Sequence, residues 1–477
     1  MEHTGLRSIL RNTTYLAGAR AVTVAARAVY VLVIAGLLGP ELYGLFNYGL
    51  SWYLLFVPLA ILGLDFLLLR EIGRARTGAP DVVPASLALR TLSSALVAAL
   101  CLGLGWWLES DPTARALLLV FAFAVMGRGL ASWTNAVFKG HEASGFVLAQ
   151  EVVFRLLEVL LGLALLAAGH GVLVLAMVHA GAWIAQGAVG LYLVRRFLRP
   201  GLQADWSLRP MLALIGAGLP FLVAAFLLGW LMQGPLVLYR QLEGTDAPLG
   251  QLALALQVFV IIGSVVAELG LAAVPVLTRA SERQDGKTAL FVQGALRAGW
   301  LLAAALAVGG ITVGAPALTW LFGPEYASAG ALLPWAVLLV GPYFWVTSLR
   351  SVFVAHGRYW QIAGAMFAGA LVFSIIFVPL VGCCELTGVF YATGIGLIGT
   401  VATQLLLLRG TDAVDPMGSM VLPGLVTLAA LGTAGGLLWL HPVLALGGGF
   451  LALAAGALLT GTLPWRSILR LLRARPE

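Results

Sequence analysis

The sequence has few charged residues, few cysteines and no catalytic signature. Only 10% of its 477 residues are Asp, Glu, Lys or Arg, whereas soluble domains carry about 25%, which excludes an ordinary soluble domain. Its three cysteines make no disulfide framework, and its six scattered histidines lack metal-ligand spacing. The phosphate-binding motif GxxxxGK(S/T) is absent. We therefore predict that the protein is not an enzyme, contains no ATP-driven motor and holds no cofactor.

Long apolar runs fill most of the chain instead. Hydrophobic residues make up 61% of it, and the mean hydropathy is +0.98. There are 58 glycines and 21 prolines, residues that are commoner in membrane helices than in soluble ones. The composition predicts an all-α polytopic membrane protein. The net charge of +7 fits basic cytoplasmic loops better than a nucleic-acid partner.

Apolar runs of about 18–25 residues, the length that crosses a bilayer, predict fourteen transmembrane helices. The first is expected to be a retained helix rather than a cleaved signal peptide, since it is a full span and many more follow. The predicted spans are 12–38, 45–69, 85–107, 115–136, 149–168, 172–194, 211–238, 250–276, 289–313, 328–349, 361–381, 387–408, 419–440 and 443–463.

The basic residues divide sharply between the two sides of this topology. With the N-terminus inside, 20 of the 28 Lys and Arg residues lie in inner segments, two lie outside and six lie within spans. Because cytoplasmic loops are enriched in Lys and Arg, the division predicts that both termini are inside. One missed span would have exchanged the sides of every later loop.

The polar segment 195–210 predicts a division into two lobes. Six spans precede it in 1–194 and six follow it in 211–408, so both halves enter the membrane from the same side and should form parallel, pseudo-symmetric repeats. Residues 409–477 then contain two further helices and a basic tail, which we expect on the cytoplasmic lipid surface.

Arginines inside the spans are the strongest candidates for function. An arginine at the centre of a membrane helix costs about 2.5–3.5 kcal/mol on insertion scales. Arg20 and Arg27 are seven residues apart and so lie within about 20° of each other on one helical face. Arg128 and Asn135 repeat this spacing in the fourth span. Arg20 can alternatively snorkel to the inner surface, whereas Arg27 and Arg128 are mid-span.

The remaining intramembrane charges have two interpretations each. Asp65, Glu158 and Glu268 are candidates for binding a coupling ion, because a buried carboxylate can carry a proton. Each is alternatively a structural partner of an arginine, as Glu158 is expected to be for Arg155 in a self-neutralising stripe from residue 151 to 158. Arg297 is the corresponding partner considered for Glu268.

Two further arginines complete the candidate binding set. Arg240 shares a face with Gln233 near the outer end of the seventh span, and Arg297 shares one with Gln293 in the ninth. The predicted anion-binding residues are therefore Arg20, Arg27, Arg128, Asn135, Arg240 and Arg297.

Three short motifs resemble those of the polysaccharide-biosynthesis family, the O-antigen-type flippases of lipid-linked oligosaccharides. They are LLGPELYGLFNYGLSW (37–52), LAILGLDFLLLREIGR (59–74) and LFGPEYASAGALLPW (321–335). The family belongs to the multidrug/oligosaccharidyl-lipid/polysaccharide exporter superfamily. The resemblance implies two lobes around a cationic cavity, alternating access, and an undecaprenyl-diphosphate-linked oligosaccharide as substrate. It also implies a multi-pass protein of a bacterial or archaeal cytoplasmic (inner) membrane, driven by an H⁺ or Na⁺ gradient.

The expected partners are the lipid-linked glycan, membrane lipids and enzymes of glycan synthesis such as a polymerase and glycosyltransferases, with no nucleic acid. Two alternatives stay open. The first is an ion-coupled multidrug or metabolite exporter of the same superfamily, although organic cations would favour an acidic cavity. The second is a non-transporting member of a glycan-synthesis complex, in which the intramembrane charges are structural.

Overall fold

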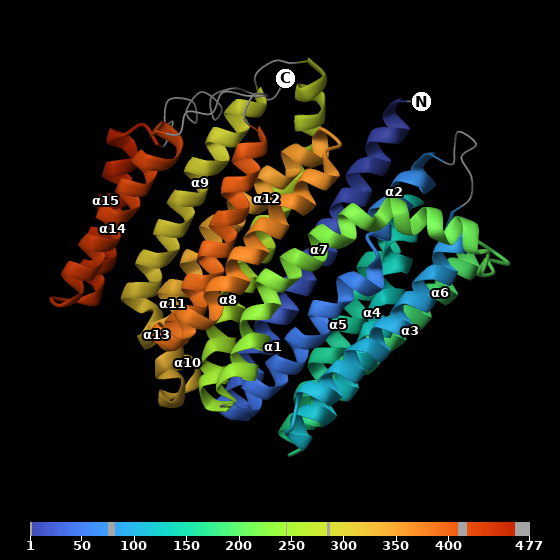
Figure 1. Cartoon of the computed structure of the whole chain (residues 1–477), viewed down its shortest axis with the longest axis horizontal. Coiled ribbons are helices and arrows are strands. Elements are labelled where there is room, and N and C mark those ends of the chain that lie inside the picture. Colours follow the sequence, from blue (N-terminus) through green and yellow to red (C-terminus); the bar gives the residue numbers. More distant parts are fainter. Residues whose placement is uncertain (1, 75–81, 245, 284–286, 409–416, 463–477) are drawn as a thin grey trace. The chain divides into compact units, whose positions relative to one another are not determined.

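The computed structural model describes residues 2–74, 82–244, 246–283, 287–408 and 417–462, and within these ranges the regular structure is entirely helical (Figure 1). This confirms the all-α prediction. The basic tail lies outside the described residues. The helices are α1 (Glu2–Ile61), α2 (Leu64–Arg74), α3 (Val83–Leu108), α4 (Pro112–Gly140), α5 (Ser144–Ala167), α6 (Val172–Leu193), α7 (Leu208–Glu243), α8 (Asp246–Arg283), α9 (Lys287–Gly309), α10 (Ala315–Phe322), α11 (Ala327–Leu338), α12 (Val340–Ala355), α13 (Tyr359–Leu408), α14 (Leu422–Leu438) and α15 (Pro442–Leu459).

Eleven helical segments of the described chain are long and apolar enough to cross a membrane. Helix α5, which has three charged residues, is not among them. Two helices each contain two of the predicted spans. α1 has 60 residues and a non-helical residue at Gly39, and α13 has 50 residues and a non-helical residue at Glu385. At about 1.5 Å per residue each is long enough for two crossings.

Two predicted spans are interrupted, which corrects the prediction of continuous helices. The span 45–69 breaks at Leu62 and Gly63, which both have positive φ (55° and 66°), and α2 begins directly afterwards. The span 328–349 contains a break between α11 and α12 at Leu339. Hydropathy averages over a window, so it detects the length of an apolar run but not a one-residue change of backbone direction.

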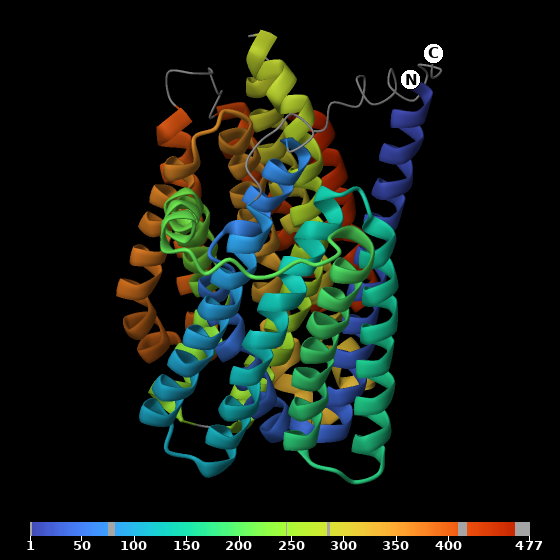
Figure 2. The same ribbon diagram turned by 90° about the vertical axis from the view of Figure 1, so that its right-hand side faces the viewer.

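The chain divides into two compact units, Met1–Ala253 and Leu254–Glu477. The first unit contains α1 to α7 and the beginning of α8. In Figure 2, α3, α4, α5 and α6 are long helices that lie side by side, and α4 packs closely on α6. α7 packs against α1, α2 and α3, so the first unit includes a helix that the sequence places after the linker 195–210.

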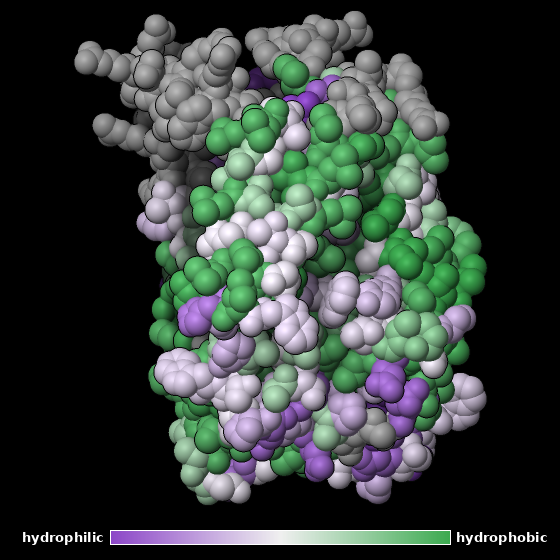
Figure 3. All heavy atoms as spheres, turned by 90° about the vertical axis from the view of Figure 1, so that its left-hand side faces the viewer, coloured by the Kyte–Doolittle hydropathy of each residue, from purple (hydrophilic) through white to green (hydrophobic). Residues whose placement is uncertain are grey.

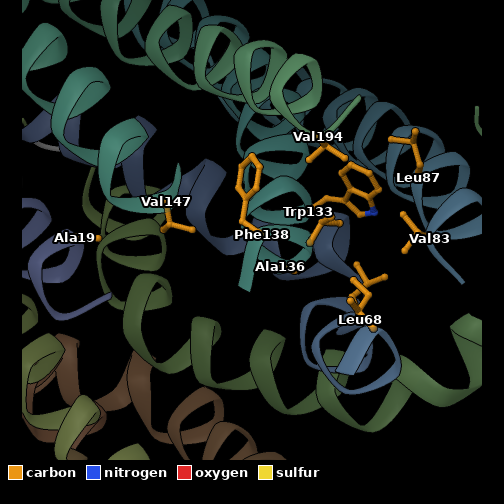
Figure 4. Close-up of a cluster of buried hydrophobic side chains, with 11 residues drawn as sticks. Ala19, Leu68, Val83, Leu87, Trp133, Ala136, Phe138, Val147 and Val194 are labelled. Atoms are coloured by element: carbon orange, nitrogen blue, oxygen red, sulfur yellow. The ribbon is translucent and has the colours of Figure 1, made fainter. Parts of the chain in front are cut away.

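A buried apolar cluster holds the C-terminal half of α4 in place. Trp133 is completely buried and donates from its indole N–H to Ser86 at 2.9 Å. Leu68, Leu87 and Phe138 surround it with the other side chains drawn in Figure 4. This cluster fixes the face of α4 that carries the polar residues discussed below.

The second unit has its own apolar packing. Ala304 and Val308 of α9 lie in one cluster with Ala430 of α14 and Leu453 of α15. Trp345 of α12 is buried and donates to the carbonyl of Leu296 on α9 at 2.9 Å. In Figure 3, hydrophobic residues cover much of the upper part of the described surface, as expected for a protein whose helices contact lipid, and more hydrophilic residues gather towards the lower end.

Candidate functional site

Three predicted arginines lie in the first unit, on two helices. Arg20 and Arg27 belong to the first arm of α1, and Arg128 lies in the middle of α4. Arg27 is close enough to both Arg128 and Arg20 for their charges to repel it. The structure therefore brings together two arginine faces that are about 100 residues apart in the sequence.

Arg128 is held by aromatic groups. Its Nη1 donates to the hydroxyl of Tyr53 at 3.0 Å, and its guanidinium lies 4.7 Å from the centre of the Trp183 ring. Tyr53 is in turn stacked on Phe121 with ring centres 5.3 Å apart. A phenol and an indole face orient the guanidinium without neutralising it.

A buried histidine lies directly behind Tyr53. His179 of α6 contacts the Tyr53 hydroxyl through Nε2 at 2.8 Å and Oε1 of Glu158 through Nδ1 at 2.5 Å. The indole N–H of Trp183 also donates to Nε2, at 3.2 Å. Arg128 on α4 is thus linked through Tyr53 on α1 to His179 on α6 and Glu158 on α5.

The predicted charged stripe of α5 continues this arrangement. Arg155 forms ion pairs with Glu158 and, at 3.7 Å, with Glu151. Gln186 of α6 accepts from Arg155 at 2.9 Å and donates to Glu151 at 3.0 Å. Thr23 of α1 donates to Glu151 at 3.1 Å. The pairing predicted along the stripe is present, and it neutralises Arg155.

We call this set of residues the buried polar network. Its side chains come from α1, α4, α5 and α6, and they are linked by hydrogen bonds, ion pairs or cation–π contacts. Its members are Thr23, Tyr53, Arg128, Glu151, Arg155, Glu158, His179, Trp183 and Gln186.

Asp65 takes part in a separate contact set of the first unit. Its carboxylate accepts from the fully buried Arg90 at 2.6 Å and from Ser132. Arg90 also donates to the carbonyl of Gly129 at 3.2 Å. The structure thus provides the arginine partner that was the alternative interpretation of Asp65.

Asn135 and Arg240 belong to other helices of the first unit. Asn135 is half-buried on α4, and its Oδ1 accepts no hydrogen bond among the described residues. Arg240 is buried at the end of α7, where it pairs with Glu109 at 3.4 Å and Asp111 at 3.5 Å. Two carboxylates therefore offset the charge of Arg240.

The predicted charges of the second unit are placed differently from expectation. Glu268 of α8 is exposed in the structure rather than buried, and its charge acts on Arg350 of α12. Arg297 is half-buried on α9. Glu268 is exposed because of its position around the helix: residues that share one face of α8 need not face the core of their own unit.

Sequence reasoning missed Tyr53, His179 and Trp183. A signal for them was present, because His179, Trp183 and Gln186 are spaced i, i+4 and i+7 and so share one face of a helix. Tyr53 directly follows the motif 37–52. Among the described residues, no group of three or more His, Cys, Asp or Glu side chains is arranged to hold a metal ion.

Two glycines, one of them in the motif 59–74, permit close backbone contacts in the first unit. Gly63 has φ +66°, and a Cβ there would lie 2.4 Å from the carbonyl oxygen of Gly218 on α7. A Cβ on Gly250 of α8 would lie 1.9 Å from the carbonyl oxygen of Pro40. The contact of Gly63 explains why the motif 59–74 contains glycine at a chain reversal, and the contact of Gly250 lets α8 pack against Pro40 of the motif 37–52.

Comparison with known proteins agrees with this architecture. A family model described as polysaccharide biosynthesis protein matches residues 9–281, more than half of the chain. No curated protein matches the chain in sequence.

Several solved structures share the fold. The lipid II flippase MurJ, in an inward closed conformation, matches with a TM-score of 0.67 and 14% identity over 96% of this chain and 100% of that one. The eukaryotic MATE transporter AtDTX14 matches with a TM-score of 0.58 and 13% identity over 85% and 97%. A mutant of the Vibrio cholerae MATE transporter VcmN matches with a TM-score of 0.57 and 14% identity over 84% and 97%.

Proposed function

The chain belongs to the polysaccharide biosynthesis protein family, and we propose that it is a flippase of an undecaprenyl-diphosphate-linked oligosaccharide. In this proposal it moves the lipid-linked glycan across the cytoplasmic membrane for export of a cell-surface polysaccharide. The observation that carries the proposal is the approach of Arg27 to both Arg128 and Arg20 inside a membrane protein. Family membership and the shared fold of flippases and transporters support the general class.

The balance of charge in the first unit supports an anionic substrate. Arg90, Arg155 and Arg240 are each paired with carboxylates. Arg128 instead contacts Tyr53 and Trp183, and Arg27 lies near two other arginines as well as Tyr53 and Tyr43. Like charges gathered in a membrane are costly. A diphosphate would offset that cost, and guanidinium groups suit its multiple oxygens.

The proposed mechanism is alternating access. Arg20, Arg27 and Arg128 bind the diphosphate, while Asn135 is available to contact the first sugars. The lobes 1–194 and 211–408 then rock so that the site opens to the other side, and the lipid tail stays in the bilayer. An H⁺ or Na⁺ gradient resets the cycle. Fourteen crossings with both termini inside complete this proposal, supported by the helical residues that coincide with each predicted span.

The competing functions fit the site less well. Organic cations, the substrates expected for a multidrug exporter, would be repelled by the arginines of α1 and α4. A non-transporting member of a synthesis complex would have no use for closely spaced like charges, which destabilise the fold. A catalytic role would need a nucleophile or general base beside Arg128, whose guanidinium instead contacts the phenol of Tyr53 and the indole of Trp183.

Charge-neutralising variants test the proposal in a strain that lacks the chromosomal copy. We expect Arg27→Gln and Arg128→Gln each to reduce export of the glycan about tenfold or more, since a charged hydrogen bond contributes about 1.5–3 kcal/mol. Arg128→Lys should restore part of the export because it keeps the charge but not the planar fork. Arg196→Gln is the matched control, since Arg196 is exposed beyond the end of α6.

Reconstitution then separates transport from a supporting role. Purified protein in liposomes is supplied with a polyprenyl-diphosphate oligosaccharide, and the fraction that becomes accessible to an added glycosidase is measured. Accessibility that depends on Arg128 supports the flippase. Normal export by both Arg27→Gln and Arg128→Gln, at wild-type protein levels, would exclude the proposed binding site.

A further inference from the structure

The contacts of His179 indicate which ring nitrogen carries the hydrogen in the neutral imidazole. The indole N–H of Trp183 can only donate, so Nε2 of His179, at 3.2 Å, is its acceptor and carries no hydrogen. The ring hydrogen is then on Nδ1, which donates to Oε1 of Glu158 at 2.5 Å. This arrangement corresponds to the neutral imidazole tautomer with its hydrogen on Nδ1. The Tyr53 hydroxyl donates to Nε2 at 2.8 Å and accepts from Arg128 at 3.0 Å.

A proton added to Nε2 would rearrange two donors beside Arg128. Nε2–H would donate to the oxygen of Tyr53, which already accepts from Arg128, so the Tyr53 hydrogen would need a new acceptor. The N–H of Trp183 would lose its acceptor as well. Tyr53 and Trp183 are the two groups in contact with the guanidinium of Arg128. A phosphate oxygen bound at Arg128 could accept from both.

We propose that His179 is a proton-binding site linked to anion binding at Arg128, with Tyr53 as the positioning residue between them. The inference rests on the proposed diphosphate substrate and adds to it the group that binds the coupling proton. Protonated His179 strengthens diphosphate binding, and by reciprocity bound diphosphate strengthens proton binding at His179.

The charges around His179 favour such a link. Glu158 and Arg155 face it from α5, Arg128 lies behind Tyr53 on α4, and Phe121 and Tyr53 contact its ring from α4 and α1. On its own helix, α6, the indole of Trp183 is the contact. The two carboxylates Glu151 and Glu158 balance the charges of Arg155 and Arg128 while His179 is neutral. A proton on His179 therefore adds charge next to Arg128, which an incoming anion compensates.

Calorimetry on the purified full chain in detergent tests the link directly. The probe is a polyprenyl diphosphate carrying one sugar, because its diester phosphates have no proton to exchange near neutral pH. Titrations in two buffers of different ionisation enthalpy, over about pH 5.5–8, report both affinity and protons taken up. This interval spans the ordinary titration range of histidine.

We expect the affinity of the wild-type protein to rise about tenfold from the alkaline to the acidic end of this range, within the usual size of coupling between two sites. A tenfold coupling corresponds to a maximal uptake of about half a proton per bound probe. His179→Gln keeps an acceptor and a donor but cannot gain a proton. Its affinity should be independent of pH, with no proton uptake.

Tyr53→Phe is the second variant, since it removes the hydroxyl that joins His179 to Arg128 while leaving both charges. We expect it to bind the probe with a pH dependence reduced to less than about threefold. Proton uptake that persists unchanged in His179→Gln, or wild-type binding that is independent of pH, overturns the inference but leaves the flippase proposal standing. Failure of the wild-type protein to bind the probe at any pH overturns the flippase proposal and this inference with it.

Discussion

Arg90 and Arg128 differ in their partners, and the difference separates a structural from a functional candidate. Arg90 is fully buried and contacts Asp65 and the carbonyl of Gly129. Arg128 has a phenol and an indole instead. Removing a partner should therefore affect different properties at the two positions: stability at Arg90 and substrate binding at Arg128.

The Arg90–Asp65 pair should be required for stability. Asp65→Ala leaves a buried guanidinium without its carboxylate, which typically costs about 3–5 kcal/mol. We expect a clear fall in the thermal midpoint of the detergent-solubilised protein. The double variant Arg90→Met with Asp65→Ala should recover part of the loss, because it removes both charges. Glu243→Gln, at an exposed position at the end of α7, serves as the control.

If the Asp65→Ala variant were as stable as the wild type, the contact between Asp65 and Arg90 would not be needed for folding. A double variant less stable than Asp65→Ala alone would likewise contradict the expectation, because it would assign the cost to lost packing by the long Arg90 side chain rather than to its charge.

Between elements, glycine marks the places where helices meet most closely. Gly39 has φ +69° with open space around a Cβ, Gly250 has ordinary backbone but no room for a Cβ, and Gly63 has both constraints. The three positions therefore separate the cost of backbone conformation from the cost of a steric clash.

Alanine substitutions at these three glycines should destabilise the protein to different extents. Gly39→Ala is expected to destabilise the protein by about 1–3 kcal/mol through its backbone alone, because φ 69° with ψ 169° lies in a region populated essentially by glycine. Gly63→Ala should cost more, because its Cβ would also meet the backbone of α7. Gly250→Ala should cost several kcal/mol or force α8 away from Pro40. Gly36→Ala, helical and in open space, should be neutral or stabilising by up to about 1 kcal/mol.

Thermal midpoints measured in one detergent give the ranking. If Gly63→Ala were no more harmful than Gly39→Ala, the close contact of Gly63 with Gly218 would have no energetic role, and the motif glycine would be explained by its φ alone.

For the whole molecule, the topology makes a prediction at a native cysteine. Cys383 is exposed at the break in α13 near Glu385, a position that fourteen crossings with an inner N-terminus put outside. A membrane-impermeant maleimide added to intact cells should label a variant in which Cys383 is the single remaining cysteine. Buried Cys101 should stay unlabelled in the matching variant that retains it.

The variant Ser207→Cys in a cysteine-free background tests the inner side of the membrane. Ser207 is exposed and lies in the linker 195–210. We expect labelling there only after the membrane is made permeable. Labelling of Cys383 and Ser207→Cys from the same side would show that the number of crossings between them is even, and the proposed topology would be wrong.

The sequence by itself determined the all-helical membrane fold class and located the long apolar helices, because bilayer thickness imposes a length and an apolar composition that can be read locally. It also indicated the backbone break after Gly39, since glycine followed by proline carries its conformational preference within two residues. Arg27 and Arg128 were found in the same way, because a charge in an apolar run is conspicuous without knowledge of its neighbours.

Only the tertiary structure decided which charges have partners. Tyr53 and His179 are 126 residues apart, and Glu109 meets Arg240 across 131. No local pattern records such distances. The tertiary structure also placed Glu268 on the surface of its unit and showed a break at Leu62 and Gly63. The physical reason is common to all these cases: hydropathy and helical phase are properties of one segment, whereas a polar partner depends on how several segments pack.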